Sequence, residues 1–260
     1  MRIGVFTSGE PRHIWFSNRL LEFASNVNVI AEKKTIPASH QTEGEGLNAY
    51  YSRMKIAEKE LFGSELEFST EIQLSTIQRG SFASVEKQID KMVRDSDLIL
   101  VFGSSFIKGD LCKKLIERRA INIHLGIAPF YRGSACNFWA MYDGRYDLVG
   151  ATGHFLTEGL DDGPIIFHAF SEQYQNDPFQ FTMGAVKAAS FGLEKVIQIS
   201  EVFNNYSQKQ DDLKLLRHSK RRDFTSQIAS QFLRALPSQK MISHRLSLRD
   251  LSAFQNPLFY

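Results

Sequence analysis

Cysteine is scarce in this chain: its 260 residues include two, Cys112 and Cys136, which lie far apart in the sequence. Such spacing forms neither a disulfide framework nor the ligand pairs of a zinc site, so we expect no bound metal. Free thiols are typical of a reducing compartment, and we expect a cytoplasmic protein. No apolar run approaches membrane-spanning length, and residues 1–6 favour a strand over a signal peptide, so we expect no membrane partner.

Excess charge of either sign is also small, because 31 Lys and Arg residues nearly balance 29 Asp and Glu residues and leave a formal net charge of +2. Nucleic-acid-binding domains usually carry a strongly basic face, so we expect no nucleic-acid partner. The basic run at residues 220–222 ends at Asp223 and is typical of a solvated segment before a helix. No Gly-x-Gly-x-x-Gly run follows the first predicted strand, which argues against a dinucleotide-dependent oxidoreductase.

Hydrophobic residues make up 43% of the chain, and its 21 phenylalanines suggest one large domain with an aromatic-rich core. Short apolar runs predict strands at residues 3–6, 27–31, 98–102, 120–124, 149–156 and 165–170. Helical spacing predicts helices at residues 14–23, 49–62, 84–94, 110–118 and 178–202. Strands that alternate with helices indicate an α/β fold with a mainly parallel sheet.

Polar residues mark the predicted helix starts. Asp177 followed by Pro178 has the order of an N-cap and a first helical residue. Ser134 is predicted to cap a short helix that follows it, and Asp223 is predicted to cap a helix over residues 224–236.

The chain changes character after residue 203, where it becomes polar and basic. We therefore predict a main α/β domain over residues 1–203 and a short, partly helical C-terminal extension over residues 204–260. Residues 33–47 are polar and contain Pro37 and two glycines, which predicts a loop.

Polar side chains stand where two buried strands end. Ser105 follows one strand, Asn122 and His124 close the next, and Asp161 lies in a tight turn further on. Because ligands of parallel α/β sheets bind at the carboxyl ends of strands, we expect a site at this edge of the sheet. Asn, His and Asp together can hold a developing oxyanion and move a proton, and acyl transfer to an amine requires both.

Four segments around these residues resemble the folate-dependent formyltransferases. They are Asn122-Ile123-His124, Pro129 with Arg132-Gly133, residues 150–157 and residues 160–166. The family includes glycinamide ribonucleotide formyltransferase, methionyl-tRNA formyltransferase and the sugar-nucleotide N-formyltransferases. The resemblance implies an enzyme that transfers a formyl group, with a Rossmann-like formyltransferase domain as the catalytic domain over residues 1–203.

The resemblance also implies a role for particular positions. Asn122, His124 and Asp161 match the catalytic trio of the family. The formyl donor of the family is 10-formyltetrahydrofolate, whose pterin would lie between two loops of this chain. The donor-binding residues implied in this way are Phe106, Ile107, Lys108, Leu156, Thr157 and Asp161.

The acceptor side departs from the family pattern. Residues 125–128 read Leu-Gly-Ile-Ala where the family usually has Pro-Ser-Leu-Leu, and the chain after residue 203 looks too short for the barrel domain of the tRNA enzyme. The sugar-nucleotide branch is then the best match, and it implies as acceptor the primary amine of a nucleotide-linked amino sugar used in surface glycan biosynthesis. Arg12, His13 and Arg132 are expected to bind the acceptor phosphates.

Other interpretations stay open. The acceptor could be methionyl-tRNA or a ribonucleotide, or the chain could be a non-catalytic α/β binding module, although a pure binding module would not need the trio. Folate and a nucleotide sugar are the expected partners, and the formation of a homodimer is left open. Asp162 is interpreted as a turn former and His154 as a buried supporting residue rather than a catalyst.

Overall fold

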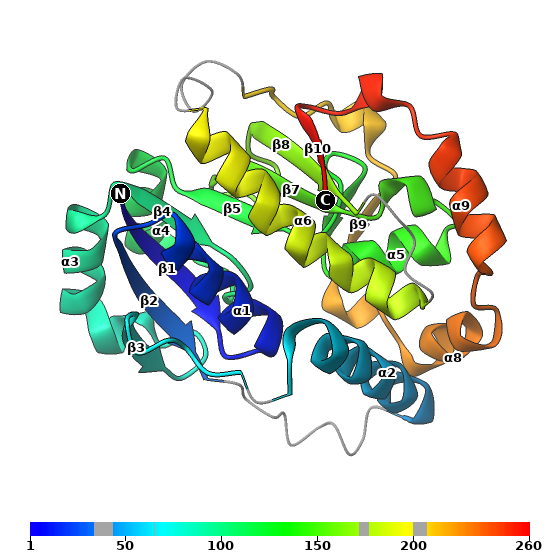
Figure 1. Ribbon diagram of the computed structural model, residues 1–260, viewed down its shortest axis with the longest axis horizontal. Helices are drawn as coiled ribbons and strands as arrows, with labels where there is room; N and C mark the ends of the chain where they lie inside the picture. Colours follow the sequence, from blue (N-terminus) through cyan, green and yellow to red (C-terminus); the bar gives the residue numbers. More distant parts are fainter. Residues whose placement is uncertain (34–43, 65, 172–176, 200–206) are drawn as a thin grey trace.

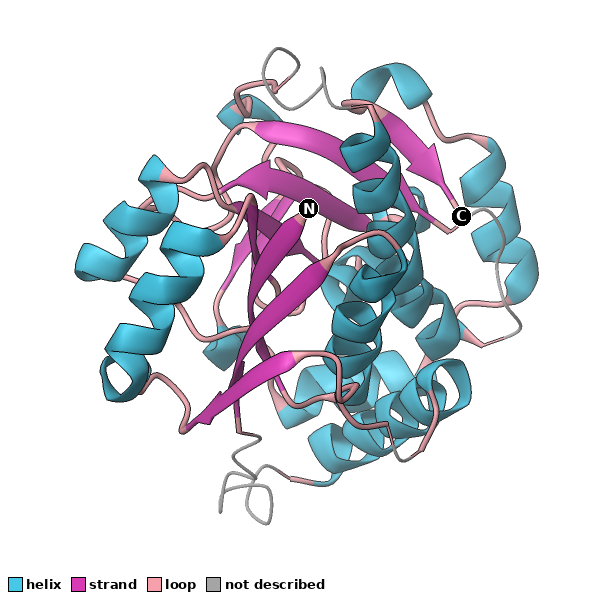
Figure 2. Ribbon diagram, turned by 60° about the vertical axis from the view of Figure 1, so that its left-hand side comes forward, coloured by secondary structure: helices cyan, strands magenta, loops and turns pink. Residues whose placement is uncertain are grey.

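The computed structural model describes residues 1–33, 44–64, 66–171, 177–199 and 207–260. In these residues one twisted sheet runs through the molecule, and helices cover both of its faces (Figures 1 and 2). This arrangement confirms the predicted α/β fold. Across the described residues, no helix combines the length and apolar character that spanning a bilayer requires.

The main sheet has eight strands in the order β10-β8-β7-β5-β4-β1-β2-β3. Their bounds are β1 Arg2–Ser8, β2 Asn26–Glu32, β3 Gln73–Ile77, β4 Leu98–Val101, β5 Ile121–His124, β7 Ala151–Phe155, β8 Ile165–Phe170 and β10 Pro257–Phe259. Strand β7 runs antiparallel to both β5 and β8, and the other neighbours pair in parallel. The predicted mainly parallel sheet is therefore confirmed, and β7 is the strand that reverses.

Helices fill the connections between the strands. Their bounds are α1 Pro11–Arg19, α2 Glu45–Phe62, α3 Glu86–Asp95, α4 Gly109–Glu117, α5 Cys136–Tyr142, α6 Pro178–Gln198, α8 Ser226–Arg234 and α9 Gln239–Ser247. Helix α1 ends sooner than predicted, at Arg19, where a short 3₁₀ turn takes over. The predicted end of α6 at residue 202 and most of the predicted loop at residues 33–47 lie outside the described residues.

Sheet residues alternate between two separate cores. Val5 packs with the α1 and α6 side, whereas its neighbour Phe6 packs with the α3 and α4 side, and both side chains are fully buried. Successive side chains of a strand point to opposite faces, so a strand buried on both faces needs a continuous apolar run. Strand β3 lacks such a run because its side chains, apart from Ile77, are exposed or half-buried, and the sequence analysis missed it.

One predicted helix cap is confirmed and two are wrong. Asp177 accepts hydrogen bonds from the backbone N–H groups of Phe179 and Gln180, at 2.7 and 3.2 Å, as expected of an N-cap. Helix α5 instead starts after Ala135, which has a left-handed backbone and no side-chain cap. Helix α8 is capped by Thr225 and not by Asp223. The carboxylate of Asp223 instead accepts from the N–H of Lys220 and closes a 3₁₀ turn before the helix.

The last part of the chain returns to the body of the protein. Strand β10 pairs with β8 at the edge of the main sheet, and helix α8 packs on α2 (Figure 1). A third core cluster joins aromatic rings from both parts, including Tyr50 of α2 and Phe232 of α8, whose ring centroids lie 6.2 Å apart. The predicted boundary between residues 203 and 204 lies outside the described residues, and the division into domains stays a prediction.

Strand β8 carries a buried histidine whose two ring nitrogens are both hydrogen-bonded. His168 is 1% exposed; its Nε2 donates to the carbonyl of Ala128 at 2.7 Å, and its Nδ1 accepts from the N–H of Gln255 at 2.9 Å. An accepting Nδ1 requires a neutral ring. Burial lowers the pKa of His168 to about 4, although the carbonyl of Ala128, which accepts from Nε2, opposes the shift.

We predict that His168 makes stability fall in mild acid. Since its pKa is about 4 in the folded state and about 6.5 when unfolded, the unfolded chain takes up the proton first. The free energy of unfolding should therefore drop by roughly 3 kcal/mol from this group as the pH falls from 6.5 to 4.

Urea unfolding at several pH values tests this. His168→Gln should flatten the decline of the unfolding free energy between pH 6.5 and 4, and His244→Gln, an exposed histidine, should leave it unchanged. A wild-type slope in His168→Gln would contradict the assignment.

Candidate active site

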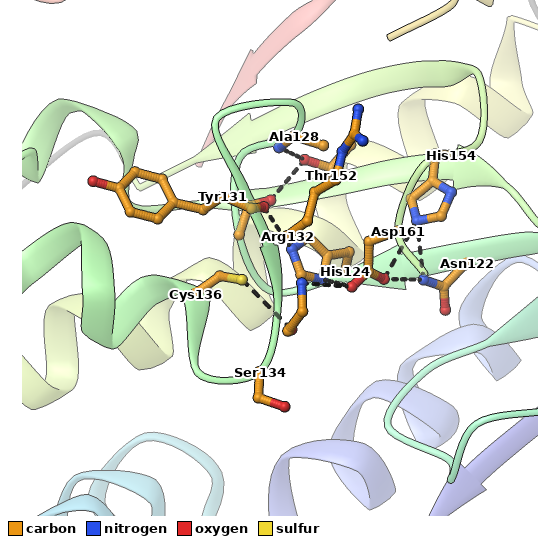
Figure 3. A network of polar contacts seen from close by, with 12 residues as sticks. Asn122, His124, Ala128, Tyr131, Arg132, Ser134, Cys136, Thr152, His154 and Asp161 are labelled. Atoms are coloured by element: carbon orange, nitrogen blue, oxygen red, sulfur yellow. Dashed lines mark hydrogen bonds and ion pairs between the residues drawn. The ribbon is translucent and has the colours of Figure 1, made fainter. Parts of the chain in front are cut away.

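The predicted trio comes together at the carboxyl end of β5. Asn122 and His124 are two residues apart on this strand, so their side chains point to the same face. Asp161 lies in the turn between β7 and β8. This turn leaves β7 at Phe155, opposite Ile121 at the start of β5, and folds back so that Asp161 reaches Asn122 and His124. Figure 3 shows the three side chains converging from these two elements.

His124 is held between two hydrogen-bond acceptors. Its Nδ1 lies 3.3 Å from Oδ2 of Asp161, and its Nε2 lies 3.1 Å from the carbonyl oxygen of Tyr131. The histidine is 7% exposed and the aspartate 9%. A neutral imidazole has one N–H and can satisfy one of these acceptors, whereas a protonated ring satisfies both. A proton added to His124 would therefore have an acceptor at each ring nitrogen.

Three donors surround the carboxylate of Asp161. Besides His124, the amide of Asn122 donates to Oδ1 at 3.2 Å, and the backbone N–H of Gly133 donates to Oδ2 at 3.0 Å. Burial alone would raise the pKa of Asp161, but the nearby His124 and the Gly133 N–H hold it well below its usual range. The carboxylate is therefore ionised at neutral pH.

The pKa of His124 moves down. Burial is the largest cause, and it outweighs the opposing attraction of the ionised Asp161. At neutral pH the neutral imidazole is therefore favoured, beside a carboxylate that stabilises the ring once it is protonated. This is the electrostatic arrangement of a group that accepts a proton during a reaction and returns it afterwards.

Asn122 uses both of its amide hydrogens inside the protein. Its Nδ2 lies 3.2 Å from Oδ1 of Asp161 and 3.0 Å from Nε2 of His154. The other ring nitrogen of His154 faces the Phe155 carbonyl at 2.9 Å, so His154 accepts at Nε2 and donates at Nδ1. His154 is 2% exposed, which confirms that it is buried; its supporting role stays a prediction. If Asn122 donates to a substrate oxygen, as the sequence analysis expects, it must first release one of these two hydrogens.

The segment after β5 is packed inward. Thr152 is fully buried; its Oγ1 donates to the carbonyl of Gly126 at 2.6 Å and accepts from the N–H of Ala128 at 3.0 Å. Ile127 and Ala128 are themselves fully buried. The interpretation of residues 125–128 as the acceptor side of the site is therefore wrong for these two positions, whose side chains face the core.

Asp162, the neighbour of Asp161, does not share its environment. Its side chain is exposed and accepts a short hydrogen bond from the hydroxyl of Thr157 within the same turn. This contact confirms the interpretation of Asp162 as a turn former.

The two predicted donor-binding segments are neighbours. Ile107 is 5% exposed and belongs to the core cluster against which Leu156 packs, and the N–H of Leu156 donates to the carbonyl of Ala120 at 2.8 Å. Phe106 is 56% exposed and Lys108 is also exposed, so their side chains are open to a ligand. Donor binding by these residues stays a prediction.

Glu32 fixes the first of these segments, and the sequence analysis missed it. Its buried carboxylate, at the end of β2, accepts from the N–H and the hydroxyl of Ser105 and from the N–H of Gly80, each at 2.6 Å. No local pattern distinguishes this glutamate, because its partners come from two other strand-end loops.

The three basic residues predicted to bind phosphate make different contacts. Arg12 pairs with the buried Glu58 at 2.7 Å. His13 is 4% exposed, its Nδ1 lies 2.7 Å from the Ser8 hydroxyl, and burial holds its pKa well below the usual value. Arg132 is 7% exposed and does not extend into solvent. Phosphate binding by these residues stays a prediction.

Arg132 connects the site to the C-terminal part of the chain. Its Nε donates to Oε1 of Gln210 at 2.8 Å, and its Nη2 pairs with Asp212 at 2.7 Å. Its own strand, β6 (Tyr131–Gly133), pairs in parallel with β9 (Arg217–Ser219). The sequence analysis gave no signal for Gln210, a single glutamine in a polar segment.

Metal binding has no candidate here: within the described residues, no group of three His, Cys, Asp or Glu side chains is placed to hold an ion.

A family model described as formyl transferase matches residues 24–180. The match includes β5, the turn with Asp161 and the strands β7 and β8. It ends before Gln210 and Asp212, the two residues that pair with Arg132.

Among curated proteins, the chain is similar to the mitochondrial formyltetrahydrofolate deformylase 1 of Arabidopsis thaliana. The two are 36% identical over 87 residues, a stretch that covers 31% of this chain and 25% of that protein. The chain thus matches about a quarter of the length of this relative.

Solved structures share the fold over most of the chain. A sugar N-formyltransferase from Shewanella sp FDAARGOS_354 is 20% identical, with a TM-score of 0.54 over 86% of this chain and 78% of that one. An N-formyltransferase from Helicobacter canadensis, solved with folinic acid and dTDP-3-aminofucose, is 15% identical, with a TM-score of 0.51 over 89% of this chain and 80% of that one.

We predict that Gly133 is needed for the close approach of β6 and β9. A Cβ at this position would overlap the carbonyl oxygen of Ser219, and the backbone is left-handed, with φ of 94°. Gly144 is a matched control, since its φ is 69° and the space that a Cβ would take there is open.

Urea unfolding of the two alanine variants separates strain from overlap. Gly144→Ala should cost about 1–2 kcal/mol, the usual penalty of a left-handed alanine. Gly133→Ala should cost clearly more, because β9 must also move. Equal losses would mean that the strands are not held in contact at Ser219.

Proposed function

The chain belongs to the formyl transferase family, and from that premise we propose that it transfers a formyl group from 10-formyltetrahydrofolate to the primary amine of a nucleotide-linked amino sugar. The observation that carries the proposal is the buried network of Asn122, His124 and Asp161 at the carboxyl end of β5. These three side chains supply the donors and the proton acceptor that formyl transfer needs.

The reaction begins when the neutral amine attacks the formyl carbon. A carbon–nitrogen bond forms and the formyl oxygen gains negative charge. Asn122 and His124 donate hydrogen bonds to this oxygen, and each gives up one of its contacts inside the protein to do so. A preorganised donor of this kind is worth about 2.7–4 kcal/mol. The bond from the formyl carbon to N10 of the folate then breaks, and tetrahydrofolate leaves with the proton that the amine has lost. Asp161 orients His124 and, directly or through water, helps to move that proton.

The donor would lie between the loop at residues 106–108 and the segment containing Leu156 and Thr157. The packing of Leu156 against the cluster that contains Ile107 supports this placement, because it brings the two segments together. The Helicobacter canadensis relative was solved with folinic acid, a folate. Recognition is expected to rest largely on backbone groups, and the exposed ring of Phe106 offers additional contact area.

The acceptor assignment rests on the sugar N-formyltransferases among the related structures, one of which holds dTDP-3-aminofucose. The small net charge is in keeping with a small acceptor, since tRNA recognition favours a broad basic face. The charges of Arg12 and Arg132 are already paired with Glu58 and Asp212. An acceptor pyrophosphate would therefore have to share these cations or use backbone N–H groups at the start of α1.

Hydrolysis of the donor is the second candidate function. It is favoured by the 36% identity to a formyltetrahydrofolate deformylase over 87 residues. The same His124–Asp161 pair could activate water in place of an amine, and the products would then be formate and tetrahydrofolate. The cytoplasmic location stays a prediction under either function, and the formation of a homodimer is left open.

The catalytic assignment predicts that His124→Ala and Asp161→Asn each lower kcat by roughly 10²–10⁴-fold, the range typical of a lost proton-transfer group. Folate affinity, measured by calorimetry, should change little, because these interactions matter mainly in the transition state. The double variant should lose far less than the product of the single losses, since the two residues act as a unit.

Asp162→Asn is the matched control for Asp161→Asn. It makes the same chemical change one residue away, on an exposed side chain that takes part in a turn, and it should keep near-normal turnover. Near-normal turnover in Asp161→Asn or His124→Ala would show that the wrong residues have been assigned.

The substrate assignment predicts formylation of an amino-sugar nucleotide. The protein is incubated with 10-formyltetrahydrofolate and a panel of such sugars, and mass spectrometry follows products that are heavier by one formyl group. Arg132→Ala should raise KM for the acceptor more than for folate. Release of formate at the same rate with and without any amine would favour the deformylase instead. Efficient formylation of methionyl-tRNA or a ribonucleotide, with every sugar ignored, would overturn the sugar assignment.

A further inference from the structure

Gln210 contacts the turn that carries Asp161, although it is 49 residues away in sequence. Its side-chain Nε2 donates to the backbone carbonyl of Asp161 at 2.9 Å and to that of Gly163 at 2.8 Å, and its Oε1 accepts from Arg132 at 2.8 Å. The residue is 8% exposed. It lies in the C-terminal part of the chain, outside the family match at residues 24–180.

A primary amide is the side chain that suits this position. Two backbone carbonyls need hydrogen donors, and the Nε–H of Arg132 needs an acceptor. These demands also fix which end of the Gln210 amide is nitrogen and which is oxygen. A carboxylate of the same size could serve Arg132 but would place two more acceptors against the carbonyls of Asp161 and Gly163.

The backbone of Asp161, which Gln210 contacts, has an unfavourable conformation. Asp161 has a φ of 53°, in the left-handed region, which costs a residue with a Cβ about 1–2 kcal/mol. Such conformations persist where surrounding contacts impose them. The direction of the Asp161 carboxylate towards His124 follows from this backbone, so a contact that fixes the backbone also fixes the carboxylate.

Gln210 is itself anchored by the backbone on both sides. Gln208 exchanges two hydrogen bonds with Ile165 at the start of β8, each of 2.8 Å. Further along, β9 pairs with β6, and the carbonyl of Ser219 accepts from the N–H of Ser134 at 2.9 Å. The segment from Gln208 to Ser219 thus crosses the site and is fixed at both ends.

The same segment also supports the carboxylate indirectly, through β6. Gly133, the last residue of β6, donates its N–H to Oδ2 of Asp161, and β6 is held in place by β9. The backbone of Asp161 is therefore fixed through Gln210, and its carboxylate through Gly133.

We propose that Gln210 is a positioning residue, which holds Asp161 in the backbone conformation that aims its carboxylate at His124. The role rests on the proposed formyl transfer, in which Asp161 and His124 move the proton. Under this proposal the segment that contains Gln210 contributes to the active site.

The first test compares Gln210→Ala and Gln210→Glu with Gln208→Ala. Gln208 is exposed and contributes backbone bonds to the bridge with Ile165, so its variant alters the same segment and should leave turnover unchanged. Gln210→Ala should lower kcat by about 100-fold, the loss typical of a reacting group misplaced by about 1 Å, with KM for folate nearly constant. Gln210→Glu should lose at least as much. Turnover in Gln210→Ala equal to that of Gln208→Ala would overturn the proposal.

A double-variant cycle distinguishes positioning from general support. If Gln210 acts through Asp161, adding Gln210→Ala to Asp161→Asn should not lower the residual kcat further. A full multiplicative loss in the double variant would show that Gln210 acts elsewhere and would also overturn the proposal.

The ring titration of His124 gives a readout that needs no turnover. Nitrogen-15 NMR, with the signal assigned from the His124→Ala spectrum, follows its pKa in folded protein. The attraction of Asp161 raises this pKa, so Asp161→Asn should lower it, Gln210→Ala should lower it part of the way, and Gln208→Ala should leave it unchanged. An unchanged His124 pKa in Gln210→Ala would contradict the positioning role. If the wild type formylates no acceptor, the proposed function fails, and this titration still decides whether Gln210 orients Asp161.

Discussion

The buried negative charge of Asp161 is the constraint on which the rest of the site depends. An ionised carboxylate that is 9% exposed must be met by donors, because burial without them costs far more than a folded protein can offset. Three groups supply them: the Asn122 amide, the His124 ring and the Gly133 N–H. The first two are side chains of β5, and the third is a backbone group of β6. Removing any one of them leaves a buried charge with less compensation, so the three segments are tied to one another.

The sheet topology makes this convergence feasible. Strand β5 presents Asn122 and His124 at its carboxyl end, as parallel strands do in ligand-binding α/β proteins. Strand β7 runs antiparallel to β5, and Phe155 at its end lies opposite Ile121, so the turn before β8 starts at the amino end of β5. It folds back along the strand, and Asp161 thereby meets Asn122 and His124. The pairing of β7 with β5 therefore keeps the β7–β8 turn beside β5, and the fold of the turn itself brings Asp161 to the other two side chains.

Buried polar groups also organise the edge where the donor is proposed to bind. The carboxylate of Glu32 gathers the N–H groups of Gly80 and Ser105 and the Ser105 hydroxyl, and so joins the ends of three strands. Arg12 and Glu58 form a comparable pair at the start of α1. In each case an acidic side chain close to full burial is satisfied by groups from distant loops, which fixes those loops relative to the sheet.

The sequence by itself determined the α/β fold, most strands and helices, and the presence of polar residues at the end of β5, because hydrophobic periodicity and helix-start signals are local. It also predicted that Asp161 belongs to the site, because residues 160–166 resemble a segment of the folate-dependent formyltransferases. Tertiary structure alone decided that Gln210 and Glu32 belong to the site's surroundings, that both amide hydrogens of Asn122 are engaged, and that β3 joins the sheet. The physical reason is that a hydrogen bond between residues far apart in the chain leaves no periodic pattern in either segment, and folding alone brings its partners together.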